Sequence, residues 1–293
     1  MKRWMIGAAM LVFALVPLEA TAQLRGHHVL GDQGLYSGTQ PGRGAYFGAM
    51  VPFYTASKVK DADGNEIGGS GSLTMWGIAP MAHFVTELEI LGAHYGFKVV
   101  VPFVSAAPEI PRLDADSGFG FGDIQVVPLQ LGWHWDWTDA IFQYSFFAPT
   151  GRYSLGALDN RGLGMWSHEF ALGLTYHIDN RWHVSTTAYY EIHGDKKDTN
   201  VRVGDILTLE GGLGLRMPDG RSMVGAAYYA QWKTSADSVA GLPLRGLDDH
   251  RVFGIGPEVR LLNGMIRLAG YFEINSRSYY QGISANGSVV LPF

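Results

Sequence analysis

Apolar and polar residues alternate with a period of two along most of the chain, and this pattern restricts the fold more than any other feature. In residues 265–275, Leu268 and Phe272 fall on one face of an extended strand, whereas Arg267 and Glu273 fall on the other. A helix would scatter the two charges around its circumference, because its side chains do not repeat every second residue. The pattern therefore predicts an all-β protein.

Twelve stretches carry this alternation, and we predict one strand in each. They cover residues 44–56, 71–84, 91–104, 119–134, 139–149, 164–177, 181–193, 202–217, 221–233, 250–261, 264–275 and 280–293. The connections alternate between short turns rich in Asp, Asn and Gly and longer polar segments, which is typical of bacterial outer-membrane barrels. The outward phase shifts near Val127 and Pro128, which predicts a β-bulge there.

The N-terminus has the layout of a secretory signal. Two basic residues precede an apolar run, and the small residues Ala20-Thr21-Ala22 follow it. We predict a signal peptide over residues 1–22, cleaved after Ala22. Beyond it, no apolar stretch is long enough to cross a bilayer as a helix. A closed barrel is the remaining way to sit in lipid with every backbone group paired.

These observations predict a transmembrane antiparallel β-barrel of about twelve strands over residues 44–293, located in the bacterial outer membrane. Residues 23–43 are expected to be an N-terminal arm or a plug of the barrel. A soluble β-sandwich is the alternative that shows the same alternation. The barrel is favoured because aromatic residues of the apolar face gather near both strand ends, Trp135 and Trp182 at one and Trp232 and Phe272 at the other.

Composition excludes several classes of function. The formal net charge is −5 and basic residues are not clustered, so nucleic acid is not an expected partner. The chain has no cysteine, which excludes disulfides, thiolate metal sites and a cysteine nucleophile. The final residue, Phe293, resembles the terminal aromatic signal that outer-membrane barrels present to the barrel-assembly machinery. Outer-membrane lipid and that machinery are therefore expected partners.

Catalytic motifs are absent from the sequence: there is no nucleophile elbow, zinc-protease helix or P-loop. Ser167, His168 and Glu169 are adjacent, but on a strand His168 faces away from the other two, so they cannot form one relay. His27 and His28 are a candidate metal pair, yet no second cluster has ligand spacing. We predict that both lie in a solvated arm, and we expect no cofactor, no metal and no enzymatic activity.

The face opposite the apolar one carries charged residues and tyrosines, which belong in a lumen because a charge facing lipid costs about 2–4 kcal/mol at the bilayer midplane. Whether they form an ion-pair network alone or also line a solute path is left open by the sequence. The candidate lumen-lining residues are Lys98, Glu169, Tyr189, Glu191, Glu210, Tyr229, Lys233, Glu258, Arg260, Arg267, Tyr271 and Glu273.

Several short elements resemble a known family, the MetA-pathway of phenol degradation family, also called SphA-like proteins. They are Gly122-Asp123-Ile124 with Pro128, Ala148-Pro149-Thr150-Gly151-Arg152-Tyr153, Gly164-Met165-Trp166-Ser167, Gln231, and Gly256-Pro257. The resemblance covers residues 31–293. It implies an outer-membrane, transporter-like protein associated with the breakdown of aromatic compounds, and it supplies no catalytic residues.

The favoured hypothesis is a porin-like outer-membrane channel for small hydrophobic or aromatic compounds, which diffuse passively through a constricted lumen. Two alternatives remain. One is an outer-membrane enzyme acting on lipids, which needs Ser and His on one outward face near the rim. The other is a structural barrel whose long loops carry the function.

Overall fold

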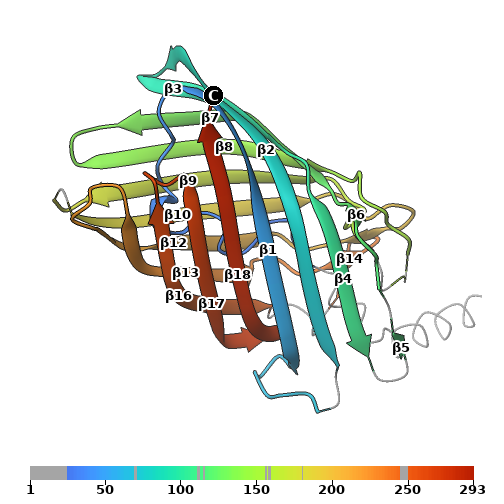
Figure 1. Cartoon of the computed structure of the whole chain (residues 1–293). Coiled ribbons are helices and arrows are strands. Elements are labelled where there is room, and N and C mark those ends of the chain that lie inside the picture. Colours follow the sequence, from blue (N-terminus) through green and yellow to red (C-terminus); the bar gives the residue numbers. More distant parts are fainter. Residues whose placement is uncertain are drawn as a thin grey trace, which may run out of the picture.

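The computed structural model describes residues 25–68, 71–110, 113–114, 116–155, 157, 160–179, 181–244 and 250–293. The predicted signal peptide lies outside these residues. They form a closed antiparallel barrel (Figure 1). Its strands are β1 (Gly44–Lys60), β2 (Ser72–Ile90), β3 (Ala93–Val100), β4 (Phe103–Ile110), β6 (Gly120–Phe121), β7 (Ile124–His134), β8 (Thr138–Ala148), β9 (Ser167–His177), β10 (Trp182–His193), β12 (Ile206–Arg216), β13 (Met223–Lys233), β16 (Arg251–Leu261), β17 (Ile266–Arg277) and β18 (Tyr279–Pro292).

Two positions in the barrel are each occupied by two consecutive strands. β3 and β4 both pair with β2, and β6 and β7 continue one another along the next position. With each of these pairs taken as one, the barrel has the twelve strands that the alternation predicts. β1 pairs with both β2 and β18, which closes the ring. Four short strands lie outside the twelve: β5 (Leu113–Asp114), β11 (Val201–Arg202), β14 (Ser238–Val239) and β15 (Leu242–Pro243).

Four predicted strand boundaries are wrong by four residues or more. β1 continues to Lys60 rather than ending at residue 56. β2 continues to Ile90 rather than ending at residue 84, because its pairing with β3 extends to the turn. The strand predicted over residues 91–104 runs on to Ile110 as β4, with a break at Pro102, which cannot donate to a ladder. β12 begins at Ile206 rather than at residue 202. The β7–β8 register shifts between Val126 and Leu129, which confirms the predicted bulge.

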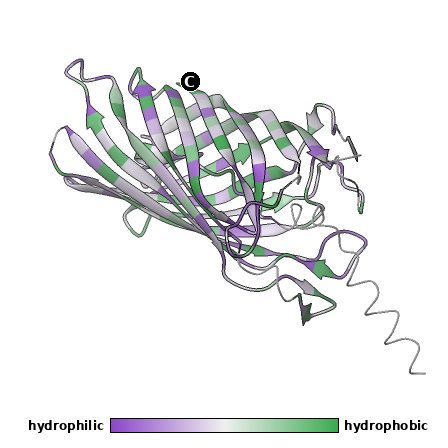
Figure 2. Cartoon of the chain, turned by 90° about the horizontal axis from the view of Figure 1, so that it is seen from below, coloured by the Kyte–Doolittle hydropathy of each residue, from purple (hydrophilic) through white to green (hydrophobic). Residues whose placement is uncertain are grey.

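The two faces of each strand differ as the alternation requires. On β17, the side chains of Leu268 and Phe272 are 57% and 59% exposed, whereas Arg267 and Tyr271 are 2% and 1% exposed. Figure 2 shows hydrophobic and hydrophilic positions interspersed along the strands. The outward side chains include the aromatic residues predicted near the strand ends, among them Trp135, Trp182 and Trp232.

The connections at one end of the barrel are short and most of those at the other end are long. Short turns join β2 to β3, β7 to β8, β9 to β10, β12 to β13 and β16 to β17. The long-loop end has one exception, because Ser278 alone joins β17 to β18 and takes a positive φ of 47° to do so. Among the described residues, none forms a helix of the length and hydrophobicity needed to cross a membrane.

Residues 25–43 run inside the barrel, where the blue segment of Figure 1 passes among the strands. We call them the N-terminal segment. It contains one turn of 3-10 helix, η1 (Gly34–Tyr36), which contacts β10, β12 and β13. Leu35 is fully buried there in a cluster with Met223, Ala227, Tyr229 and Tyr271. This cluster anchors the segment to the inner face of the barrel.

Candidate functional site

The N-terminal segment is held by an arginine from β17. The Arg267 guanidinium donates to the backbone oxygens of Gly31 (2.8 Å) and Asp32 (2.9 Å) and to the Glu258 carboxylate (2.9 Å). Arg260 donates to Glu258 as well (2.7 Å) and to the backbone of the segment. Because Glu258 is 1% exposed and lies between both arginines, its charge is compensated inside the barrel.

Two glycines let the segment approach these side chains closely. Gly31 and Gly34 have positive φ values of 75° and 60°, which favour glycine. A Cβ at Gly34 would collide with the Glu258 carboxylate, and one at Gly31 would collide with the Tyr271 ring. The backbone therefore fits against Glu258 and Tyr271 only without a side chain at these positions.

The two histidines of the segment contact four carboxylates of the barrel. The His27 ring lies 2.9 Å from Asp123 Oδ2 through Nε2, and its backbone N–H donates to Glu191 (2.6 Å). His28 Nδ1 lies 2.7 Å from Glu169 Oε2, and Nε2 lies 3.1 Å from Glu210 Oε1. The prediction of a solvated arm is wrong, because both rings are buried at hydrogen-bonding distance from carboxylates contributed by the wall.

Protonation of both rings is favoured by these carboxylates. Burial alone would lower the pKa of His28, but the charges of Glu169 and Glu210 outweigh it and hold this pKa well above the usual value. Burial likewise lowers the pKa of His27, yet its hydrogen bonds to Asp123 and Glu191 raise it overall. The acidic wall therefore favours the charged form of both rings.

Ser167, His27 and Asp123 form a chain of hydrogen bonds that resembles a hydrolase triad. His27 Nδ1 lies 2.8 Å from Ser167 Oγ. The arrangement is unsuited to nucleophilic catalysis, because Ser167 is 0% exposed and its hydroxyl is not accessible to a substrate. The prediction for His168 is confirmed: it lies on the outer face and its ring contacts the Tyr144 hydroxyl (2.9 Å).

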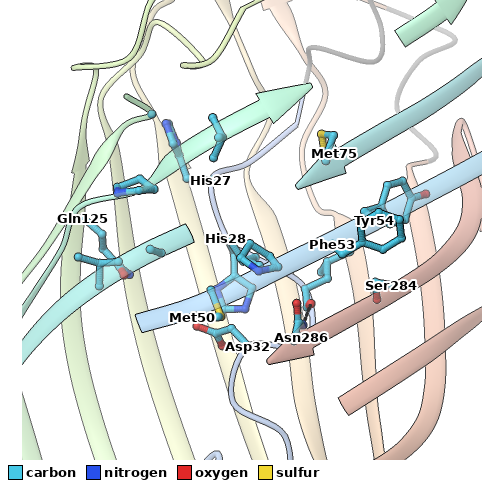
Figure 3. A pocket seen from close by; sticks show the side chains of 18 of the residues that line it. His27, His28, Asp32, Met50, Phe53, Tyr54, Met75, Gln125, Ser284 and Asn286 are labelled. Atoms are coloured by element: carbon cyan, nitrogen blue, oxygen red, sulfur yellow. Dashed lines mark hydrogen bonds between the residues drawn. The ribbon is translucent and has the colours of Figure 1, made fainter. Parts of the chain in front are cut away.

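Two cavities lie between the N-terminal segment and the opposite wall of the barrel. One, of about 370 Å³, reaches the long-loop end, where Asn160 and Arg161 line it. The other, of about 470 Å³, reaches the short-turn end, where Arg221 and Asn263 line it. We call them the loop-side and turn-side cavities. Figure 3 shows the loop-side cavity, which is lined by Met50 and Tyr54 of β1, by Met75 of β2 and by His28 and Asp32 of the segment.

The two cavities share part of their lining, so they meet inside the barrel. We call the shared residues the junction; they are His28, Asp32, Gln33, Met81, Lys98, Gln125, Arg260, Gly264 and Val290. Three of them come from the N-terminal segment and the rest from the wall. The junction is therefore formed jointly by the segment and the wall.

The family model described as MetA-pathway of phenol degradation matches residues 56–287 of the chain. The chain belongs to this family. The match spans most of the barrel and agrees with the resemblance carried by the sequence elements around Asp123 and Gly151. A search of curated proteins finds no match for this family member.

A solved structure shows the same fold for this member of the phenol-degradation family. The crystal structure of an outer membrane channel from Pseudomonas putida F1 superposes with a TM-score of 0.73, at 15% identity, over 91% of this chain and all of that one. The chain is thus a twelve-strand β-barrel of the outer-membrane type. The toluene transporter TodX of Pseudomonas putida superposes with a TM-score of only 0.43, at 11% identity, over 85% of this chain and 89% of that one.

The predicted lumen residues lie on the inner side of the barrel wall. They fall into two groups. One group lines a cavity: Lys98, Glu169, Tyr189, Tyr229, Arg260 and Arg267. The other group is covered by the N-terminal segment or by neighbouring side chains: Glu191, Glu210, Lys233, Glu258, Tyr271 and Glu273. Lys233 forms an ion pair with Asp237 (2.8 Å) near the long-loop end, and Glu273 accepts hydrogen bonds from Tyr54 and Tyr229.

Lys98 differs from the other cations among the predicted lumen residues. Lys233 pairs with Asp237. Arg260 and Arg267 pair with Glu258, and both histidines contact carboxylates. In the part of the chain that the structure describes, no hydrogen bond or ion pair reaches the Lys98 ammonium, which lies at the junction.

Sequence reasoning missed the segment's own contribution to the junction. His28, Asp32 and Gln33 lie there, although residues 23–43 carry no strand pattern. The signal that could have found them is the combination of two histidines and two glycines within eight residues, which suits close packing against an acidic wall. The methionines at positions 50, 75 and 81 were also missed, because the sequence does not distinguish a methionine that lines a cavity from any other apolar strand residue.

Proposed function

We propose that the protein is a passive outer-membrane channel for small, largely apolar solutes, aromatic compounds among them. The solutes move through the loop-side cavity, the junction and the turn-side cavity. The observation that carries the proposal is the pair of cavities, which reach opposite ends of the barrel and share a lining. Membership of a family named for phenol degradation supports the choice of aromatic compounds.

The dimensions and lining suit such solutes. A dry cavity of about 150 Å³ accommodates benzene, and both cavities are larger than that. Met50, Met75 and Met81 supply flexible, polarisable surface on one side. Two polar groups at the junction, Lys98 and Gln125, can orient a hydroxyl or carbonyl group.

Reconstituted protein tests this proposal. We expect liposomes carrying the mature chain to take up phenol or benzyl alcohol faster than empty liposomes, and a disaccharide no faster. Met81→Trp fills the junction, so it should slow uptake strongly while the free energy of unfolding stays within about 1 kcal/mol of the wild type. Leu291→Trp, at an outward position, is the matched control and should leave uptake unchanged.

Uptake equal to that of empty liposomes, with heat-modifiable gel mobility showing a folded barrel, contradicts the proposal. In cells, a deletion strain should grow more slowly than the parent only on low concentrations of the compounds that the channel admits. A panel of aromatic and aliphatic carbon sources identifies them.

A further inference from the structure

Three side chains converge on one point inside the barrel. His28 and Asp32 come from the N-terminal segment and Glu210 from β12. Each offers one ligand atom, and the three atoms lie within 4.8 Å of one another. An imidazole nitrogen and two carboxylate oxygens are a ligand set that Zn²⁺ accepts in proteins.

One carboxylate oxygen of the cluster has no partner within the described part of the chain. Asp32 Oδ1 is buried and has no hydrogen-bond partner among the described residues, whereas Oδ2 accepts from the Gln33 side chain (3.1 Å). A carboxylate oxygen that is removed from water and has no donor destabilises the folded state. A bound cation removes that cost.

The orientation of His28 is the one that metal ligands take. Its Nδ1 lies 2.7 Å from Glu169 Oε2, and Glu169 is 1% exposed. A metal-ligating histidine usually donates its other ring N–H to a carboxylate, which fixes the ring and the tautomer. With the proton on Nδ1, the Nε2 lone pair is directed toward Glu210 and is available to an ion.

The cluster is also reachable from the lumen. His28 and Asp32 both line the loop-side and turn-side cavities, while Glu210 is completely buried behind them. An ion bound by the three would have a coordination position facing the junction, as in zinc sites that keep one position open.

We propose that His28, Asp32 and Glu210 bind one Zn²⁺ ion, with Glu169 as the positioning residue of His28. The ion replaces the proton on His28 Nε2, which leaves to solvent. Water, or a phenolic or carboxylate oxygen of a solute, completes the coordination. The ion links the N-terminal segment to β12 and is independent of whether the barrel transports solutes.

Metal titration tests this proposal on the full mature chain, folded in detergent, carrying no histidine tag and stripped with EDTA. Calorimetric titration with ZnCl₂, and metal analysis after dialysis, should give one ion per chain. Glu169→Gln should weaken binding about 10–100-fold. Asp32→Asn removes a ligand, so it should weaken binding further still. Glu273→Gln changes a buried carboxylate elsewhere in the lumen and should bind as the wild type does.

Cobalt provides a spectroscopic check. Co²⁺ added to the stripped wild type should give visible absorption bands of a protein-bound ion, and Asp32→Asn should lose them. Heat-modifiable mobility establishes that each variant is folded. The proposal is overturned if the folded wild type binds no stoichiometric Zn²⁺, or if Asp32→Asn binds it as tightly as the wild type, which would show adventitious binding.

Discussion

The two sides of the barrel lumen are built from the same strand pattern but have different contents. On one side, which we call the packed wall, β9, β10, β12, β16 and β17 contribute carboxylates, two arginines and Tyr271, all of which bond to the N-terminal segment. On the other, the cavity wall, β1, β2 and β3 contribute Met50, Met81 and Lys98, which face space. Alternation therefore determines which residues face inward, and the chemistry of those residues determines where the lumen is filled.

Hydrogen-bond satisfaction explains why the segment lies where it does. Glu191, Glu210 and Glu258 are each at most 1% exposed, so their oxygens need donors from the protein. The segment supplies them through the backbone N–H groups of His27, Gly31 and Leu35. The methionine side chains of the cavity wall do not need hydrogen-bond donors, and the space beside them stays open.

The largest expected effect comes from breaking the packed wall. Arg267→Leu removes a donor from Glu258 and from two backbone oxygens of the segment, so we expect the free energy of unfolding to fall by about 3–5 kcal/mol. Urea titration of the barrel in lipid vesicles measures this. Replacing Arg267 and Glu258 together should recover part of the loss, and a double variant no more stable than Arg267→Leu would contradict the pairing.

The neighbouring residue provides an independent comparison on the same strand. Leu268 faces outward, so Leu268→Arg should cost about 2–4 kcal/mol if it lies near the midplane of the bilayer. This loss should appear in lipid as reduced assembly, and it should not open the lumen. An assembled amount equal to that of the wild type would place Leu268 away from lipid.

The barrel itself could be predicted from sequence, with all but two strand ends within four residues, because period-two alternation is a local signal. The inward positions of β17, such as Arg267 and Tyr271, follow from the same signal. The path of the N-terminal segment could not be predicted. His27 contacts Glu191, 164 residues away along the chain, and no local pattern specifies such a contact. That Lys98 has no hydrogen bond or ion pair within the described residues could not be predicted either, since this depends on contacts across the lumen.

A smaller change in barrel stability should follow when the N-terminal segment is displaced and the packed wall is left intact. Gly34→Ala places a Cβ against Glu258 at a positive φ, so we expect the segment to leave the packed wall while the barrel stays folded. Single-channel conductance in planar bilayers should rise above that of the wild type. Gly220→Ala, also at positive φ but with open space around it, is the matched control and should leave conductance unchanged. Unchanged conductance in both variants would show that the segment does not restrict the lumen.

The smallest change in stability is expected from a substitution on the cavity wall. Lys98→Leu removes a cation that has no hydrogen bond or ion pair within the described residues, so the free energy of unfolding should change by no more than about 0.5 kcal/mol. The selectivity of the channel should shift toward cations, because a lumen charge tunes passage rather than insertion. Reversal potentials under a salt gradient measure this shift. A loss of stability as large as that of Arg267→Leu would mean that the two walls do not differ as described.

The central claim is that the N-terminal segment covers the packed wall and leaves the cavity wall open. Because the chain has no cysteine, single cysteines introduced at residues 81 and 227 report on each wall separately. Met81 lies at the junction, and Ala227 is 0% exposed beneath Leu35. The labelling rate of the folded barrel with a small water-soluble thiol reagent is the decisive measurement. We predict fast labelling and blocked uptake for Met81→Cys, and labelling of Ala227→Cys only after unfolding. Equal labelling rates at the two positions in the folded barrel would contradict the account.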